Sequence, residues 1–330
     1  MTKTGSSAIF SFLHKNAGLL EAQGTVLPIL SAGSAFWPDR RNASFIHALL
    51  DEGELPENEM QAVEACLVEL AGYACNYETV ILRDELMWFC RGDFWLRAAA
   101  LARDAGFERL SVILYLRRPD MHLASEWKQR CQGGAPPMSF EEFCEIRATN
   151  DCYDYEALVE AIERGLPQED ILLRAYDRER LAGGDLFQDV CEAAGITWNQ
   201  DFTRPVRGTN PSVSYDVAEA LRRLRLEGTT VRIGAFRHLF STWHPDPPGM
   251  TPFTPDAARA FSERYIDGYQ RLSERHFDGK PLFSSDYNHP KWVPNEDRIA
   301  SYRRWFLRAH KLLSLPGRFA RKIRKADKRG

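Results

Sequence analysis

The sequence has no long hydrophobic run, and no apolar stretch approaches the roughly 18 residues that a membrane-spanning helix needs. It also has no secretory leader pattern, because charged and polar residues appear too early at its N-terminus. Its 7 cysteines are odd in number, scattered and without C-x-x-C spacing, which argues against a disulfide framework or a zinc site. We therefore predict a cytoplasmic protein with reduced thiols.

Two motifs of catalytic sites are missing as well. No Asp-rich or His-rich cluster stands out, so the sequence predicts no metal site. The ATP-type loop G-x-x-x-x-G-K-[ST] places its lysine after the second glycine. In this chain Lys3 precedes the nearby glycine, Gly5, which argues against an ATP-hydrolysing loop.

The composition that remains is that of an ordinary soluble globular protein, with 330 residues of which 44% are apolar and 27% are charged. A chain of this length can bury a sizeable core. The formal net charge of −3 hides an asymmetry, since residues 298–330 hold 12 basic residues and one acid, Asp327, on an otherwise acidic chain. Such a basic tail predicts attraction to an anionic partner.

The apolar pattern predicts strands that alternate with helices. The predicted strands are 25–29, 79–82, 110–116 and 170–175, and the predicted helices are 8–16, 45–50, 59–72, 94–105, 140–147, 155–163 and 186–194. This alternation predicts parallel β-α-β units in a three-layer α/β domain, with a central parallel sheet flanked by helices. Beyond Arg204 the chain is predicted to be mostly helical.

The N-terminus has the residue types of a phosphate-binding loop. Residues 3–7 read Lys-Thr-Gly-Ser-Ser and run directly into the predicted helix. Glycine lets the backbone approach an anion, the first-turn N–H groups and the hydroxyls donate to it, and the lysine neutralises it. The alternative is a frayed terminal segment, since short Lys/Gly/Ser runs are common there.

A second motif follows the predicted strand 110–116. Arg117 stands at the end of this strand, Pro119 breaks the chain, and a helix begins that carries Ser125. Strand, Arg-x-Pro and a helix with serine at this spacing resemble the 3′-phosphate loop of sulfotransferases that use 3′-phosphoadenosine-5′-phosphosulfate. In that family an opening such as Lys-Thr-Gly-Ser-Ser is the 5′-phosphosulfate loop, and the two motifs occur here in the family's order.

The resemblance covers most of residues 1–290 and is closest to bacterial sulfotransferases of the carbohydrate and exopolysaccharide kind. It implies a P-loop-like domain over residues 1–290, followed by a basic amphipathic tail over residues 291–330. The segment 207–212 resembles the family's Asn-x-Ser segment. Relatives carry a short apolar strand just before the first loop, whereas only Met1 and Thr2 precede it here, which we interpret as a start site assigned too late.

The resemblance also implies roles for single residues. The donor 3′-phosphoadenosine-5′-phosphosulfate would contact Lys3, Thr4, Gly5, Ser6, Ser7, Arg117 and Ser125, with Tyr176 beside its adenosine. Glu85 would be the general base, while Lys3 and Arg83 would stabilise charge on the leaving phosphate and the sulfuryl oxygens.

Each role has a structural alternative. Glu85 could cap a following helix, in which case Asp84 or His47 would be the next candidate for the base. Arg117 could pair with an acid at the strand end, and its neighbour Arg118 is expected to be solvated. Tyr176 could be a core residue. His122 is expected near the 3′-phosphate loop, with no catalytic role. Trp37, Trp88 and Trp95 could line an acceptor pocket or could belong to the core.

The predicted function is therefore transfer of a sulfuryl group to a hydroxyl or amine of a glycan or glycolipid, with no nucleic-acid partner. The alternatives are a P-loop kinase and a scaffold that kept the fold but lost catalysis. In the basic tail, apolar residues recur at helical spacing with arginines between them, at Tyr302, Trp305, Phe306, Ala309, Leu312 and Leu313. The tail would either pack its apolar stripe against the rest of the protein or bind the anionic inner face of the cell membrane.

Overall fold

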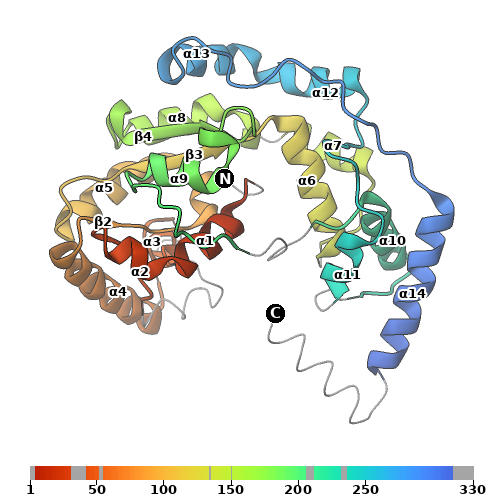
Figure 1. The fold of residues 1–330 in the computed structure, drawn as a ribbon, viewed down its shortest axis with the longest axis horizontal. Coiled ribbons are helices and arrows are strands. Elements are labelled where there is room, and N and C mark those ends of the chain that lie inside the picture. The colour runs from red at the N-terminus through yellow and green to blue at the C-terminus, as the bar shows by residue number, and fades with distance from the viewer. Residues whose placement is uncertain are drawn as a thin grey trace. The chain divides into compact units, whose positions relative to one another are not determined.

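The computed structural model describes residues 4–30, 42–51, 55–133, 135–149, 151–205, 212–231 and 236–314. The chain forms two compact units (Figure 1). The first unit comprises residues 1–117, 152–206 and 265–283, and the second comprises residues 118–151, 207–264 and 284–330. Each unit therefore joins segments that are far apart in the sequence.

The strands of the first unit form two parallel pairs. β1 (Thr25–Val26) pairs with β2 (Thr79–Val80), and β3 (Val112–Leu116) pairs with β4 (Ile171–Ala175). In the longer pair Val112 lies opposite Ile171 and Leu116 opposite Ala175. The apolar sequence Val-Ile-Leu-Tyr-Leu of β3 suits a strand that is covered by helices on its faces.

Helices connect and cover these strands in the first unit. The amphipathic helix α8 begins after Asp154, whose carboxylate accepts from the N–H of Ala157, and α9 begins after Asp185 in the same way. The α-helices are α1 (Ser6–Lys15), α2 (Ala17–Glu21), α3 (Ser44–Asp51), α4 (Glu57–Asn76), α5 (Phe94–Asp104), α8 (Tyr155–Glu163), α9 (Leu186–Ala193) and α13 (Ile266–His276), and the 3₁₀ turns are η2 (Glu85–Phe89), η4 (Gln168–Asp170) and η5 (Ala182–Gly184).

The core of the first unit holds α1 in place. Phe12 is fully buried, and its ring stacks on Phe187 of α9 at 4.8 Å between ring centroids and on Trp198 at 6.0 Å. Ring contacts of this kind add to the free energy gained from the buried apolar area. The core therefore fixes α1, whose N-terminus carries the predicted phosphate loop.

The second unit is helical and has an aromatic centre. Trp127 is buried and contacts the rings of Phe140, Tyr215 and Trp292. Ser139 and the side chain of Glu142 form a capping box at the start of α7. The α-helices are α6 (Pro119–Gln132), α7 (Phe140–Ala148), α10 (Tyr215–Leu226), α11 (Arg237–Thr242), α12 (Pro255–Ser262) and α14 (Glu296–Ser314), while η3 (Asp151–Tyr153) and η7 (Glu263–Tyr265) lie where the chain passes between units.

The apolar stripe of α14 is packed inside the second unit. Tyr302 and Phe306 are buried, and the rings of Tyr302, Trp305 and Phe306 all contact Phe240 of α11. The helix also packs along α10. A membrane contact by this helix would thus depend on its basic side chains, and residues 315–330 of the basic tail lie outside the described residues.

The mixed α/β class, the parallel pairing and the helical character beyond Arg204 are confirmed for the part of the chain that is described. The expected single central sheet differs from the structure, in which the described strands form two separate pairs. The ladder of β1 is short because Pro28 follows it and has no N–H to donate. None of the described helices combines the length and the apolar character needed to cross a membrane.

Candidate functional site

The predicted phosphate loop leads into the N-terminus of α1. Gly5 precedes the helix with φ 78° and ψ 10°, in the left-handed region that favours glycine. Within the described residues no side chain caps this helix end, and its first turn contains no acid. The first N–H groups of the helix are thus free of a side-chain cap, and with the positive end of the dipole they suit an anion. Lys3 lies outside the described residues.

The side chains of Leu186 and Tyr176 lie close to Gly5. A Cβ atom added there would lie 2.4 Å from Cδ2 of Leu186 and 3.2 Å from the hydroxyl of Tyr176. Tyr176 directly follows the end of β4. The close approach therefore brings the predicted adenosine residue beside the predicted phosphate loop. Of the other loop residues, Thr4 is buried, Ser6 is half-buried and Ser7 is exposed.

A carboxylate reaches the same helix end from another part of the chain. The hydroxyl of Ser6 donates a hydrogen bond of 3.0 Å to Oε2 of Glu85, which begins η2. The guanidinium of Arg83 lies 3.8 Å from the same Oε2. Both side chains are partly open to solvent, with exposed fractions of 19% for Arg83 and 23% for Glu85. The structure thus brings Ser6, Arg83 and Glu85 together.

The segment that carries Arg83 is held by Asn42, a buried residue that the sequence analysis did not single out as functional. Its side-chain amide donates to the carbonyls of Pro28 at 3.1 Å and Ile81 at 3.0 Å, and its oxygen accepts from the N–H of Arg83 at 2.7 Å. One amide thereby joins the segments that follow β1 and β2. A buried side-chain amide that makes all these hydrogen bonds indicates a structural role. This signal is visible only in the folded protein.

Arg117 closes β3 and faces Tyr176. Its guanidinium carbon lies 5.6 Å from the centroid of the Tyr176 ring, a cation–π distance. Tyr155 donates from its hydroxyl to the carbonyl of Arg117 at 2.6 Å, which fixes the backbone at this point. Through Tyr176 the arginine is linked to Gly5. Ser125 is half-buried on α6, which belongs to the second unit.

A buried acid, Asp189, fixes the chain that follows β4. Asp189 accepts a hydrogen bond of 2.5 Å from the hydroxyl of Tyr115 and one of 2.9 Å from the N–H of Ala182. Burial first, and then the Asp189 carboxylate, raise the pKa of Tyr115 well above its usual range, so this phenol keeps its proton and donates. The ring of Tyr115 meets that of Tyr176 edge to face at 6.5 Å. This arrangement supports Tyr176 structurally.

The prediction that Arg118 is solvated is wrong. Arg118 is buried in the second unit and forms a two-pronged ion pair with Asp120, with distances of 2.7 and 3.0 Å. It also donates to the carbonyls of Ser284 and Asp286 and faces Nε2 of His289 at 2.6 Å. Its guanidinium therefore holds segments of the second unit together, a use that guanidinium geometry favours.

The other candidate residues that the structure describes are half-buried or buried. His47 is half-buried on α3, which contacts η2, and Asp84 is half-buried next to Glu85. His122 is buried on α6. Trp88 and Trp95 are buried, so they belong to the core and do not line an open pocket. Trp37 and residues 207–211 of the Asn-x-Ser segment lie outside the described residues.

Comparisons with known proteins give little guidance. No family model matches the chain, and no solved structure matches it. An uncharacterized protein of Archaeoglobus fulgidus is 28% identical over 116 residues, which are 35% of this chain and 30% of that protein. The chain thus spans less than a third of the length of this relative. Any function must therefore be argued from the site itself.

Proposed function

We propose that the chain is a sulfotransferase with a P-loop-like fold, and that it transfers a sulfuryl group from 3′-phosphoadenosine-5′-phosphosulfate to a hydroxyl or amine of a glycan or glycolipid. The observation that carries the proposal is the hydrogen bond from Ser6 to Glu85 beside an uncapped helix N-terminus. It combines an anion-binding element with a candidate base, which are the two parts that such a transfer needs.

The residues fit the charge and shape of this donor. The N–H groups at Gly5, Ser6 and Ser7 and the side chain of Lys3 would hold the 5′-phosphosulfate. Arg117 would hold the 3′-phosphate, and Tyr176 would border the adenosine. The bound donor supplies an activated sulfuryl group, which leaves behind adenosine 3′,5′-bisphosphate.

Glu85 is the proposed general base. Its carboxylate would take the proton from the acceptor hydroxyl or amine while that atom forms its bond to sulfur and the bond from sulfur to the 5′-phosphate oxygen breaks. Ser6 orients the carboxylate by donating to Oε2. Arg83, 3.8 Å from that oxygen, would supply positive charge near the transferred group. His47 and Asp84 are the next candidates if Glu85 proves dispensable.

The acceptor and the location are part of the proposal. A glycan or glycolipid acceptor would place the enzyme in the cytoplasm beside the inner face of the membrane, with the basic residues of 298–330 attracting anionic lipid. No nucleic acid is proposed as a partner.

One titration tests the proposal against its two rivals. The full chain is titrated by calorimetry with adenosine 3′,5′-bisphosphate, with ATP plus Mg²⁺ and with ATP alone. A sulfotransferase binds the bisphosphate, a kinase prefers ATP with Mg²⁺, and a scaffold that lost the site binds neither. Transfer of labelled sulfate from the donor to cell-envelope glycans then tests turnover.

A further inference from the structure

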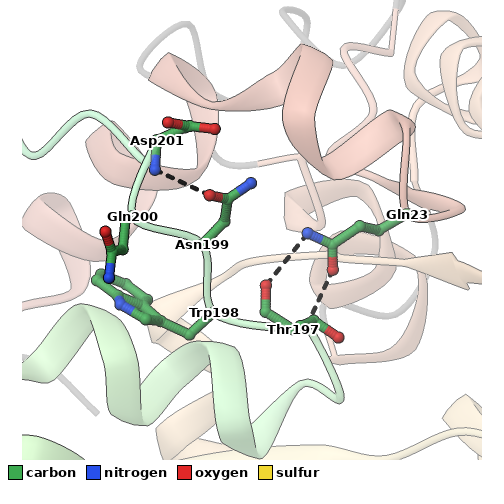
Figure 2. Close-up of a pocket in the computed structure, with 6 residues that line it drawn as sticks. All are labelled: Gln23, Thr197, Trp198, Asn199, Gln200 and Asp201. Atoms are coloured by element: carbon green, nitrogen blue, oxygen red, sulfur yellow. Dashed lines mark hydrogen bonds between the residues drawn. The ribbon is translucent and has the colours of Figure 1, made fainter.

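A cavity of about 640 Å³ in the first unit is lined by residues other than those at the N-terminus of α1. Figure 2 shows its lining, which consists of Gln23, just after α2, and the five residues 197–201 that follow α9. Thr197, Gln200 and Asp201 are exposed, so the cavity opens to solvent. None of these residues takes part in the proposed transfer.

The floor of the cavity is fixed by the fold. Gln23 donates from its amide to the carbonyl of Thr197 at 3.2 Å and accepts from the N–H of Thr197 at 2.9 Å, as the dashed lines in Figure 2 show. The indole of Trp198 stacks on Phe12 and meets Phe202 edge to face at 5.5 Å. The rings of Phe12 and Phe202 are buried and hold the indole in place. Trp198 itself is half-buried and lines the cavity.

Several polar groups of the lining are not used by the fold. Asn199 accepts from the N–H of Asp201 through Oδ1 at 2.9 Å, which leaves its amide nitrogen without a partner in the described part of the chain. The same holds for the side-chain amide of Gln200 and the carboxylate of Asp201. Together these groups both donate and accept hydrogen bonds, beside an apolar indole.

The charges around the cavity argue against an anionic ligand. Asp201 is the charged residue of the lining. The nearby guanidinium of Arg204 lies 5.8 Å from the Trp198 ring, and it is paired with Asp185 at 2.9 Å. A phosphate or sulfate would therefore meet a carboxylate and a cation that is already neutralised. An apolar ligand is disfavoured too, because it would leave the amides and the carboxylate unpaired.

We infer that this cavity is a binding site for a neutral saccharide, separate from the proposed transfer site. A sugar ring combines hydroxyls that donate and accept with an apolar C–H face, so it matches amides and a carboxylate that surround an indole. Such a site would hold a neutral stretch of glycan chain. The inference rests on the cavity alone and stands whether or not the chain transfers sulfuryl groups.

Saturation-transfer NMR of the full chain with a panel of neutral hexasaccharides, which differ in ring type and linkage, tests the inference. We expect transfer to at least one of them, with a Kd raised about tenfold in the double variant Gln200→Ala/Asp201→Ala, since the saccharide loses its hydrogen bonds to both side chains. The matched control Gln61→Ala/Asp104→Ala removes exposed groups of the same kinds from α4 and α5 of the same unit and should bind normally.

Trp198→Phe provides a second readout that keeps an aromatic ring on Phe12, and it should weaken saccharide binding as well. Transfer to no hexasaccharide, equal affinity of the double variant, or tighter binding of a sulfated than of a neutral hexasaccharide would each overturn the inference. Binding of adenosine 3′,5′-bisphosphate, measured on the same variants, should stay unchanged. Loss of saccharide binding is thereby separated from failure of the proposed transfer site.

Discussion

Ser6, the first residue of α1, donates a hydrogen bond of 3.0 Å to Oε2 of Glu85, which stands 79 residues further along the chain. The bond brings the carboxylate to the end of a helix where the dipole and the N–H groups favour negative charge. Arg83 approaches the same oxygen. A hydroxyl, a carboxylate and a guanidinium from two distant segments are thus assembled at one helix N-terminus.

Replacement of Glu85 tests its role as the base. We expect Glu85→Gln to bind adenosine 3′,5′-bisphosphate nearly as tightly as the wild type but to reduce turnover by roughly 10²–10⁴-fold, because the amide cannot take the acceptor's proton. Single-turnover transfer of labelled sulfate measures the effect. Glu64→Gln, an exposed residue of α4, is the control and should react normally. Near-normal turnover of Glu85→Gln would move the role to His47, the next variant to examine.

Replacement of Asn42 should destabilise the first unit. Asn42→Ala leaves the carbonyls of Pro28 and Ile81 and the N–H of Arg83 without their partner, and we expect a loss of about 1–3 kcal/mol in the free energy of unfolding. Urea unfolding followed by circular dichroism gives the value. Asn76→Ala serves as the control, since that exposed side chain makes a single bond to Gly72. Equal losses in the two variants would show that the amide of Asn42 does not hold these segments.

The neighbouring arginines Arg117 and Arg118 should respond differently. Arg118→Met leaves the buried carboxylate of Asp120 without its ion-pair partner, so we expect a loss of about 3–5 kcal/mol in the free energy of unfolding. Arg117→Ala should change this free energy far less. Thermal unfolding measures both, with the exposed Arg304→Met of α14 as the control for the second unit. A stable Arg118→Met protein would refute the structural role assigned to Arg118.

The first unit should lose stability when the pH falls below the ordinary pKa of histidine. Burial lowers the pKa of His276 from its ordinary value of 6.5, although Glu163 at 3.2 Å opposes the shift. Below pH 6.5 the unfolded chain therefore binds a proton that the folded chain does not, so stability is complete above this pH and declines below it.

Urea unfolding between about pH 5 and about pH 8 measures this dependence. His276→Asn should flatten the curve on its acid side, whereas the exposed His310→Asn of α14 should leave it unchanged. A curve for His276→Asn that falls as steeply as that of the wild type would assign the pH dependence to other groups.

Local signals in the sequence were enough to predict most of the elements. The helix over residues 155–163 is found where it was predicted, since Asp154 caps it and its apolar residues recur at helical spacing. The strand at 112–116 follows from an uninterrupted apolar run. The residues Ser6, Arg83 and Glu85 were predicted from the resemblance to sulfotransferase motifs, and the structure places them together.

The features that could not be predicted depend on contacts between distant segments. Arg118 and Arg117 are adjacent and alike in sequence, and the buried one is distinguished by distant partners such as His289 and the carbonyls of Ser284 and Asp286. The amide of Asn42 bonds to the carbonyl of Ile81, 39 residues further along the chain, and Gln23 lines the cavity beside Trp198 by pairing with Thr197 across 174 residues. No local pattern in the sequence encodes such partners.

Titration of the full chain with adenosine 3′,5′-bisphosphate is the most direct test of the central claim, that the N-terminus of α1 and Arg117 form a binding site for the sulfuryl donor. We expect the wild type to bind, and Lys3→Ala and Arg117→Ala each to lose about 1.5–3 kcal/mol of binding free energy, since each removes a charge-assisted hydrogen bond to a phosphate. Arg103→Ala, an exposed residue of α5, should bind like the wild type. Unchanged affinity in both Lys3→Ala and Arg117→Ala, or no binding by the wild type, would contradict the account.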